Sequence, residues 1–293
     1  MKKYKFTGES KKWGNRTLLR IVATRDFGSV KAGDIGGWIE KESNLSHEGN
    51  CWVYDNCRVY DNGIVSGNGI VYDNGRVTGN GKVYGNGKVY GNGVVCDNGR
   101  VRDNGRVAGN GRVCGNSIVY GNGIVTDDGV IYGNGRVRGN GRVYDNGRVG
   151  DNGVVYGNGI VGGNGAVYDN GAVCGNGIVR DNGVVYGNGL VRDNGVVYDN
   201  GVVETGAIIG KVSRPYKDIF QHQCKNRLLT AILTEDDEIL YTIGCQENIT
   251  KEEFINRIYN EGGGLKENPH KQEYLEVIEC VELYFSKVGG KNE

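Results

Sequence analysis

The sequence predicts a mainly β protein built around a repeat solenoid, and three observations support this fold class. Valine recurs at every sixth residue from Val53 to Val203, and of these 26 positions only Ile131 differs. Asparagine follows three residues after nearly every member of the series, with Asp128 in its place once. Glycine comes next almost throughout. A strict short period is typical of repeat architectures, in which the residues of one repeat stack on those of the next.

Each six-residue repeat predicts one short strand and one corner. Its residues Gly-x-Val-x alternate in size, which is the period-two pattern of a strand with its glycine and valine buried. The following Asp/Gly-Asn pair must turn the chain, and we expect Asn and Gly to take up the left-handed conformation of a tight corner. Each buried glycine is expected to weaken its coil by about 0.5–1 kcal/mol relative to alanine, because glycine loses more backbone entropy on folding.

An antiparallel meander is the alternative assembly, because Asn-Gly between apolar residues is a common hairpin signal. It would need one strand for every repeat in a single ribbon, well beyond the roughly ten strands of most open sheets, and would leave the valines without a second layer. Stacked coils instead give each strand a partner above and below and bring the valines together on one axis. The sequence therefore favours a solenoid.

The repeat resembles the hexapeptide repeat of left-handed parallel β-helix proteins, in which a small residue lies two places before each aliphatic one. This resemblance covers residues 51–210 and implies triangular coils of three repeats, hence about nine coils. The segments Gly36–Ile39 and Cys51–Val53 resemble the start of uncharacterised bacterial and phage hexapeptide-repeat proteins, some of them labelled acetyltransferases. The chain departs from the family because its small inward residue is mostly glycine, with Cys51, Cys57 and Ser117 as exceptions.

Residues 1–50 are expected to form a small N-terminal β cap. Leu18–Ala23 is rich in aliphatic residues and predicts a strand, and Gly33–Ile39 resembles the entry into the first coil. We expect Trp38 and Trp52 to cover the open end of the valine column, because an uncapped apolar column would associate with other chains.

Residues 211–293 predict a small α+β domain. Leu228–Thr234 and Ile239–Cys245 alternate apolar residues around an acidic turn and predict a hairpin. Thr250 with Glu253 forms the capping-box pattern of a helix start. Helical spacing then predicts two helices, the first with Phe254, Ile255, Ile258 and Tyr259 on one side and the second, after Asn268 and Pro269, with Tyr274, Ile278, Val281 and Phe285.

Residues three repeats apart are expected to stack, which produces one outward column of alternating tyrosine and arginine. Such side chains can stack through cation–π contacts worth about 0.5–1 kcal/mol each. Single-stranded nucleic acid or carbohydrate binding on this column is one hypothesis for function. Nucleic acid is disfavoured, because thirteen aspartates nearly cancel the fourteen lysines and arginines of the repeat. The candidate binding residues are Tyr84, Arg102, Tyr120, Arg138, Tyr156 and Arg192.

The outward position before each valine becomes aliphatic in the last third of the repeat. A contiguous exposed apolar patch usually marks a contact. We expect self-association, with a trimer favoured as in hexapeptide proteins that the chain resembles, and cover by the C-terminal segment is the alternative. The candidate contact residues are Val154, Ile160, Ile178, Val184, Leu190, Val196 and Val202.

The eight cysteines have scattered spacing, so free thiols are the expectation. Cys96 and Cys114 lie three repeats apart and are the one pair that stacked strands could bridge on oxidation. In the C-terminal domain, His222 with Cys224 and His270 with Cys280 suggest a Cys–His nucleophile, but Cys280 falls near the apolar stripe of its helix, an ordinary buried position. The sequence thus predicts no metal site and no catalytic residue.

Resemblance to hexapeptide acyltransferases implies an acyl-CoA groove with a catalytic histidine between neighbouring subunits. The repeat contains no histidine and no looped-out insertion. We therefore favour a non-enzymatic structural or interaction protein without a cofactor, and keep acyl transfer as the alternative.

The predicted rod displays residues 211–293 to a protein partner of unknown identity. No apolar run approaches the roughly 20 residues of a membrane span, and the first residues lack the apolar stretch of a signal peptide. We accordingly expect a cytoplasmic protein, and its resemblance to bacterial and phage hexapeptide-repeat proteins implies a phage-related one.

Overall fold

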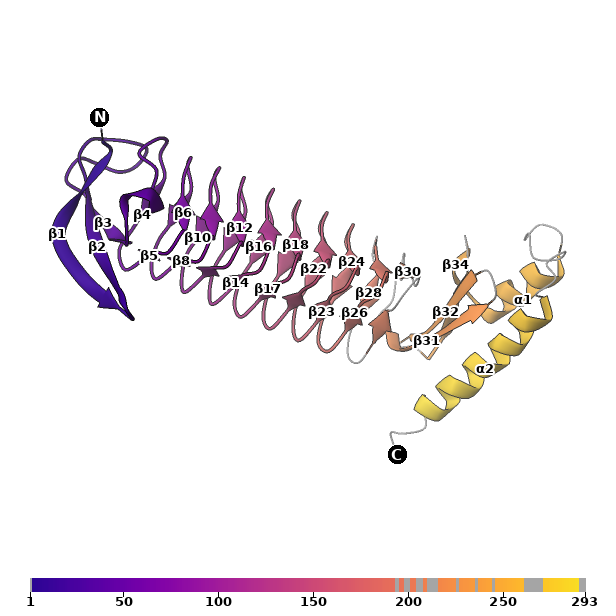
Figure 1. The fold of residues 1–293 in the computed structure, drawn as a ribbon. Coiled ribbons are helices and arrows are strands. Elements are labelled where there is room, and N and C mark those ends of the chain that lie inside the picture. Colours follow the sequence, from indigo (N-terminus) through magenta and orange to yellow (C-terminus); the bar gives the residue numbers. More distant parts are fainter. Residues whose placement is uncertain are drawn as a thin grey trace.

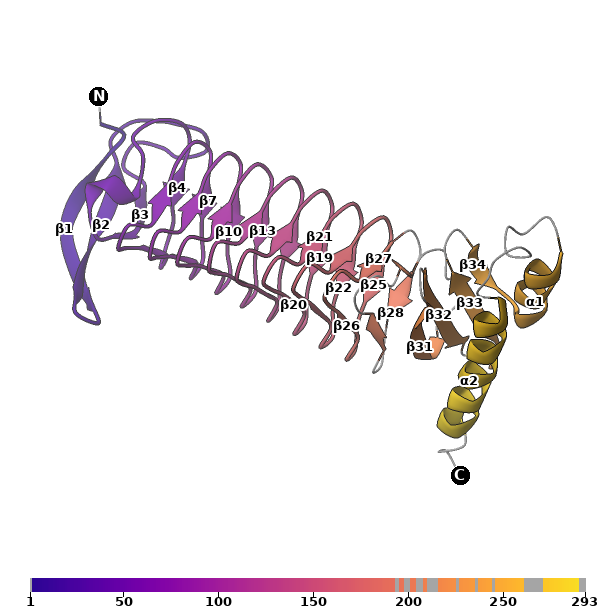
Figure 2. The same cartoon turned by 45° about the vertical axis from the view of Figure 1, so that its right-hand side comes forward.

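The protein forms a straight column with a β cap at its N-terminal end and an α+β unit at its C-terminal end (Figures 1 and 2). The computed structural model describes residues 2–192, 195–197, 201–203, 208–209, 216–224, 227–234, 237–243, 246–260 and 271–289. No helix in these ranges is both long enough and apolar enough to span a bilayer.

Three parallel sheets form the three sides of the column, and each coil of the chain contributes one strand to each sheet. The first sheet also includes two antiparallel strands of the cap; it contains β1 (Tyr4–Trp13), β2 (Arg16–Ala23), β3 (Ile35–Ile39), β5 (Arg58–Val59), β8 (Arg76–Val77), β11 (Val94–Val95), β14 (Arg112–Val113), β17 (Val130–Ile131), β20 (Arg148–Val149), β23 (Ala166–Val167), β26 (Val184–Val185) and β29 (Val202–Val203). The second sheet contains β4 (Trp52–Val53), β7 (Ile70–Val71), β10 (Lys88–Val89), β13 (Arg106–Val107), β16 (Ile124–Val125), β19 (Arg142–Val143), β22 (Ile160–Val161), β25 (Ile178–Val179) and β28 (Val196–Val197). The third sheet contains β6 (Ile64–Val65), β9 (Lys82–Val83), β12 (Arg100–Val101), β15 (Ile118–Val119), β18 (Arg136–Val137), β21 (Val154–Val155), β24 (Ala172–Val173), β27 (Leu190–Val191) and β30 (Ile208–Ile209).

The register confirms the predicted parallel solenoid with three repeats per coil. Val89 of β10 pairs with Val71 of β7 and Val107 of β13, and every other strand of the repeat has the same 18-residue offset. The valines of the series have no solvent exposure from Val53 to Val203. Each strand is two residues long, shorter than expected, because the corners take up the remaining four residues of each repeat.

The corners differ from the expectation in which residue adopts the left-handed conformation. It is the Asp or Gly before each asparagine, for example Asp73 at φ 61° and Gly91 at φ 61°, and neither the asparagine nor the glycine after it. Glycine adopts this conformation freely and aspartate is one of the few other residue types that tolerate it, which is consistent with the residues found at the position. The asparagine is thereby left with its side chain pointing outward along the edge.

The backbone of the next coil lies close to the buried glycines, so a side chain at most of these positions would have to displace it. A Cβ placed on Gly141 would lie 2.8 Å from the carbonyl oxygen of Val155 in the next coil and 3.0 Å from that of Arg138. Ser117 occupies an equivalent position, and its N–H lies 3.4 Å from the Cys114 carbonyl oxygen, whereas Gly141 N–H closes the same corner at 3.0 Å. The corner is therefore wider at Ser117, whereas Cys57, which also carries a side chain at this position, closes its corner at 3.0 Å.

The N-terminal cap covers the first coil mainly through Trp52. Trp52 is fully buried and packs edge-on against Tyr4 and Phe27. Trp38 does not belong to this core: it lies on β3, outside the column, with Lys11 Nζ 4.0 Å from its ring centroid. β3 itself pairs in parallel with β5, so the first sheet of the column extends directly into the cap.

The C-terminal unit is a four-stranded antiparallel sheet with two helices on one face. It consists of β31 (Tyr216–Cys224), β32 (Arg227–Thr234), β33 (Ile239–Ile243), β34 (Gln246–Ile249), α1 (Lys251–Tyr259) and α2 (Lys271–Gly289). The hairpin β32–β33 and the Thr250–Glu253 capping box confirm two predictions. The edge strands β31 and β34 were not predicted.

The two faces of this sheet bury different cores. The face toward the helices carries Leu229, Ala231 and Leu233. Ile232 points the other way and belongs to the valine core of the column, and Leu240 and Val196 pack against this core. The sheet therefore closes the C-terminal end of the column, as the cap closes the other.

Helix positions largely follow the predicted spacing. Phe254 and Ile258 of α1 are buried, as are Tyr274, Ile278, Val281 and Phe285 of α2. Tyr259 is 50% exposed, so its predicted place on the buried side of α1 is wrong. Cys280 is also exposed, contrary to expectation, because it lies just outside the arc of α2 that faces the sheet. His270, Cys245, Asn268 and Pro269 lie outside the described residues.

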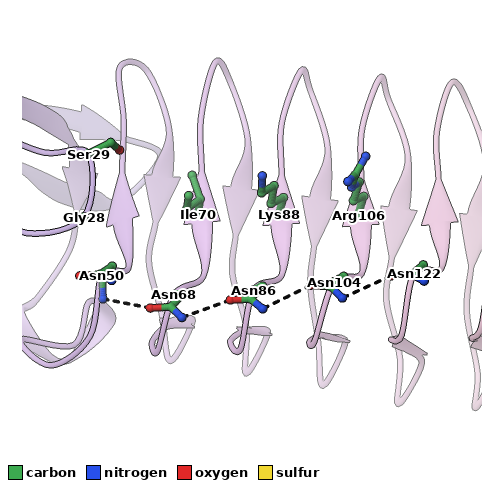
Figure 3. A pocket seen from close by; sticks show the side chains of 10 residues that line it. All are labelled: Gly28, Ser29, Asn50, Asn68, Ile70, Asn86, Lys88, Asn104, Arg106 and Asn122. Carbon is green, nitrogen blue, oxygen red and sulfur yellow. Dashed lines mark hydrogen bonds between the residues drawn. The ribbon is translucent and has the colours of Figure 1, made fainter.

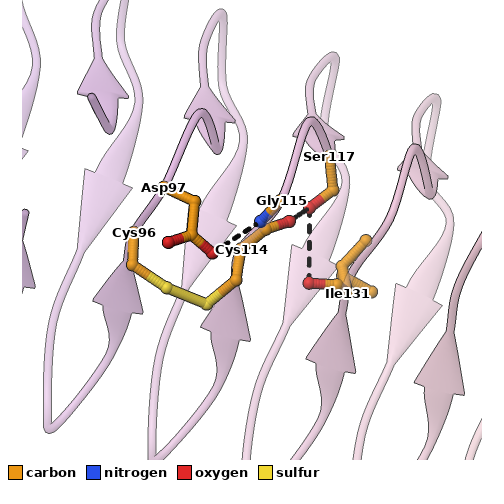
Figure 4. The surroundings of a disulfide bond; sticks show 6 residues. All are labelled: Cys96, Asp97, Cys114, Gly115, Ser117 and Ile131. Carbon is orange, nitrogen blue, oxygen red and sulfur yellow. Dashed lines mark hydrogen bonds between the residues drawn. A yellow bond between two sulfur atoms is a disulfide. The ribbon is translucent and has the colours of Figure 1, made fainter. Parts of the chain in front are cut away.

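Cys96 and Cys114 form a disulfide between successive coils (Figure 4). Their Cα atoms lie 4.7 Å apart, which is the spacing of paired strands. The expectation of free thiols is therefore wrong for this pair, and the predicted stacking of the two residues is confirmed. Asp97 beside the disulfide accepts a hydrogen bond from Gly115 N–H at 3.1 Å.

Candidate binding edge of the solenoid

The column has three long edges, and the edge between the third and second sheets differs from the other two. The chain crosses it between β6 and β7 and at the corresponding corner of each later coil. We call it the basic edge, and it consists of an asparagine row with one side-chain column on each flank. The row is Asn68, Asn86, Asn104, Asn122, Asn140, Asn158 and Asn176; the third-sheet flank is Tyr84, Arg102, Tyr120, Arg138, Tyr156, Cys174 and Arg192; the second-sheet flank is Ile70, Lys88, Arg106, Ile124, Arg142, Ile160 and Ile178.

The asparagine row is a continuous hydrogen-bonded ladder. The Nδ2 of each asparagine donates to the Oδ1 of the asparagine in the next coil, from Asn68 to Asn176, at 3.0–3.3 Å. All of these side chains are exposed. Each primary amide has a second N–H and a second lone pair that the ladder does not use, so the edge presents one donor and one acceptor per coil to the solvent.

A groove runs beside the ladder on the second-sheet side (Figure 3). Its first section, of about 530 Å³, begins at Ser29 of the cap and is walled by Lys88 and Arg106. A second section, of about 370 Å³, shares Arg106 and continues past Ile124 to Arg142. A third section, of about 340 Å³, shares Arg142 and ends near Ile178. Because adjacent sections share residues, the groove follows the edge over most of the column.

Charge is distributed unevenly among the three edges. Of the residues that the structure describes in the repeat, six of the fourteen basic side chains flank the basic edge, but only one of eleven aspartates does. The six are Lys88, Arg102, Arg106, Arg138, Arg142 and Arg192, and the aspartate is Asp103. At its left-handed corner position this edge has glycine in nearly every described coil, whereas the other two edges carry the remaining aspartates.

The single described aspartate of this edge is itself neutralised by a neighbour. Asp103 accepts from Arg102 Nη1 at 2.8 Å. Within the described ranges, no ion pair joins Lys88, Arg106 or Arg142 to a carboxylate. The groove wall is therefore cationic, although the repeat as a whole is nearly neutral.

The predicted tyrosine–arginine column lies on the third-sheet flank of this edge and stacks as expected. Arg102 lies 4.4 Å from the ring centroid of Tyr120, and Arg138 lies 4.7 Å from that of Tyr156. Tyr84 and Arg192 belong to the same column. The asparagine ladder and the second basic column beside it were not predicted from the sequence. The 18-residue spacing of the asparagines could have predicted the ladder.

The predicted aliphatic contact residues encircle the column and do not form one patch. Val154 and Leu190 belong to the third sheet, and Val184 and Val202 to the first. The second sheet carries Ile160, Ile178 and Val196. A neighbour packed against one side would cover only a third of this belt. Self-association through it, and a protein partner of residues 211–293, stay predictions.

Histidine chemistry is absent from the described column. His47 of the cap is held by structural contacts: its Nδ1 accepts from Lys3 N–H at 3.1 Å, its Nε2 lies 2.7 Å from Glu42 Oε1, and its ring stacks on Tyr4 at 4.3 Å. His222 lies in the C-terminal unit, on β31. The basic edge therefore offers hydrogen bonds and positive charge, with no histidine among its described residues and with the buried thiol of Cys174 on its third-sheet flank.

Comparison with known proteins gives a limited match. No protein-family model matches the chain. A 63-residue segment is 41% identical to an Escherichia coli (strain K12) protein named "Uncharacterized acetyltransferase YdcK", and this segment amounts to 19% of each chain. The chain thus spans about a fifth of the length of that relative.

Proposed function

We propose that the protein is a non-enzymatic binding rod whose basic edge holds a linear acidic polysaccharide. The observation that carries this proposal is the segregation of charge: the basic edge has six cationic side chains and one paired aspartate among its described residues. Screening limits electrostatic interactions to about 8–10 Å, so a polyanion on this edge interacts mainly with the cations beside it and little with the aspartates of the other edges. The attraction is therefore stronger than the near-zero net charge of the repeat suggests.

A polymer suits this edge better than a compact ligand. The groove continues over several coils, and its ladder offers the same amide groups at each coil, with 4.7 Å between the Cα atoms of stacked Cys96 and Cys114. An extended chain with a repeating unit can satisfy such equally spaced groups one after another. A small molecule would use only one or two of them.

An acidic polysaccharide suits the edge better than single-stranded nucleic acid. Proteins that bind single strands offer open aromatic faces on which bases stack. Here Arg102 covers Tyr120 and Arg138 covers Tyr156, so these rings are already in contact with the protein's own guanidinium groups. Sugar hydroxyl groups need hydrogen-bond donors and acceptors instead, and the exposed asparagine amides supply both.

The test compares charge reversals on two equivalent grooves. Lys88→Glu, Arg106→Glu and Arg142→Glu together alter the second-sheet flank of the basic edge. Lys82→Glu, Arg100→Glu and Arg136→Glu make the same charge change at the same repeat position of the third sheet, beside the asparagine row that includes Asn98 and Asn116. Binding of polygalacturonate, poly(dT) and neutral dextran is measured by titration calorimetry at several salt concentrations.

We expect polygalacturonate to bind the unmodified protein, with affinity that falls as salt rises. The basic-edge variant should lose at least about tenfold in affinity, and the control variant should change much less. Equal losses in both variants would contradict a specific edge. Binding of poly(dT) in preference to polygalacturonate would replace the polysaccharide by nucleic acid.

Acetyl transfer is the second candidate, favoured by the printed name of the partial relative. A ligand that binds only the folded state raises the melting temperature, and the rise grows with the ratio of its concentration to its dissociation constant. Acetyl-CoA at millimolar concentration should therefore shift the melting temperature if the protein is an acetyltransferase, and should leave it unchanged if the binding-rod proposal is right.

A further inference from the structure

Three metal-ligating side chains converge in the C-terminal unit, away from the basic edge. His222 and Cys224 are two residues apart on the edge strand β31, so both point to the same face of the sheet. Glu273 lies in the first turn of α2, which packs on that face. The imidazole nitrogen, the thiol sulfur and a carboxylate oxygen all lie within 4.8 Å of one another.

We propose that His222, Cys224 and Glu273 bind one zinc ion. Nitrogen, sulfur and oxygen donors together suit Zn²⁺, which is commonly held by three protein ligands with water at a fourth position. Zinc–ligand bonds of about 2.0–2.3 Å require donor atoms slightly closer than the observed limit, and a rotation of the exposed His222 side chain supplies the adjustment. The exposed side of His222 also gives water access to the fourth position.

Binding would also join two elements that the sequence places far apart. Among the described strands, β31 lies at the edge of the sheet and pairs with β32, and α2 follows β31 by more than 40 residues. A metal ion shared by β31 and α2 would fix the helix on the sheet, because binding to the folded state alone adds to folding stability.

The experiment uses the full-length chain, treated with a chelator and then titrated with Co²⁺ and Zn²⁺. Co²⁺ bound to a thiolate produces a charge-transfer band in the near ultraviolet, and Zn²⁺ should displace it. Variants Cys224→Ser, His222→Ala and Glu273→Gln test the three ligands. Cys280→Ser is the matched control, because Cys280 is an exposed cysteine of the same unit outside the cluster.

We expect one Co²⁺ per chain with a thiolate band that is lost in Cys224→Ser and retained in Cys280→Ser. His222→Ala and Glu273→Gln should weaken zinc binding at least tenfold, since losing even an outer partner of a ligand costs about 10–100-fold. Absence of the band, or a band that survives in Cys224→Ser, would overturn the site. Circular dichroism of each variant distinguishes loss of a ligand from loss of the fold.

Discussion

Asn110 Nδ2 donates a hydrogen bond to Asp128 Oδ1 at 2.9 Å, and the asparagine ladder of that edge stops there. Ladder members both accept and donate, but an ionised carboxylate only accepts. Asn146, which lies one coil after Asp128 on the same edge, begins a new ladder by donating to Asn164 at 3.1 Å. One aspartate in place of asparagine thus divides a ladder that the repeat would otherwise continue.

Replacing Asp128 by asparagine should join the two runs. The added amide can donate to Asn146, and one net hydrogen bond is worth about 0.5–1.5 kcal/mol, with the lower end expected on an exposed edge. Thermal unfolding should show a higher melting temperature for Asp128→Asn. Asp127→Asn changes the charge equally but lies at the left-handed corner position, outside the ladder, so an equal rise in this control would point to charge alone.

Alanine in place of Gly141 should destabilise the column by more than about 1 kcal/mol, because overpacking forces the backbone to shift. The new Cβ would lie 2.8 Å from the Val155 carbonyl oxygen. Ser117→Ala is the control, since this position already accommodates a Cβ, and its unfolding free energy should change little. Urea unfolding measures both. A Gly141→Ala variant more stable than the parent would show that backbone entropy outweighs the close contact.

The oxidised protein should contain six reactive thiols after denaturation, since two of its eight cysteines form the disulfide. Cys96→Ser with Cys114→Ser should lower the unfolding free energy by up to about 3 kcal/mol, the usual value for a loop of this length. A reducing agent should destabilise the parent by a similar amount and leave the double variant unchanged. Eight thiols in protein kept oxidised would contradict the bridge.

Deleting residues 121–126, one uncharged repeat, should disrupt the basic edge without changing the net charge. Every later repeat then moves round the column by one side, so Asp127, Asp128, Asp145 and Asp181 take positions on the basic edge. Arg138, Arg142 and Arg192 leave it, and only Arg148 and Arg180 replace them. Valine recurs in every repeat, so the dry axis and the fold should survive. Polygalacturonate binding should fall severalfold.

Deleting residues 121–138, one whole coil, is the matched control for that variant. It removes two aspartates and two arginines, leaves the net charge unchanged and keeps every later residue on its own side. Binding should largely persist. If the two deletions bind alike, net charge and not the placement of charge decides affinity.

Lys11 should make the stability of the N-terminal cap depend on pH. Burial, with Arg58 and Arg20 nearby, lowers its pKa from 10.5 to about 8. Below pH 8 the Lys11 amine is charged in the folded and the unfolded state, and the cost of burying its charge is present in full. From pH 8 to 10.5 the folded state binds fewer protons than the unfolded state, so this cost diminishes as pH rises. The unfolding free energy of the parent relative to Lys11→Gln should therefore rise with pH across this range.

Urea unfolding at pH 7, 8, 9 and 10 measures this difference, and comparison with a variant cancels the titration of the cap's cysteines and tyrosines. Lys5→Gln serves as the control, because Lys5 is exposed and carries the same charge. A pH-independent difference for Lys11→Gln would show that the Trp38 contact holds the ammonium without a cost.

The solenoid could be predicted because its determinants are local and repeated. A valine every six residues fixes the axis, and the same period predicts which side chains stack, including Cys96 on Cys114 and Arg102 on Tyr120. The capping box at Thr250 could be predicted equally well, since it depends on residues within one helical turn. Errors arose where a local pattern allows two backbone solutions, as at the corners, where Asp73 and not Asn74 is left-handed.

By itself, the sequence determined the period, the buried valines and the number of coils, since these depend only on the spacing of residues along the chain. The tertiary structure decided which side of the column each charge occupies, that Ile232 closes the column, and that Glu273 meets His222 and Cys224. The net charge of the repeat does not reveal that its positive and negative side chains lie on different edges. Three repeats form one coil, so residues that are neighbours in the sequence lie on different edges, and electrostatic attraction depends on their distance in space.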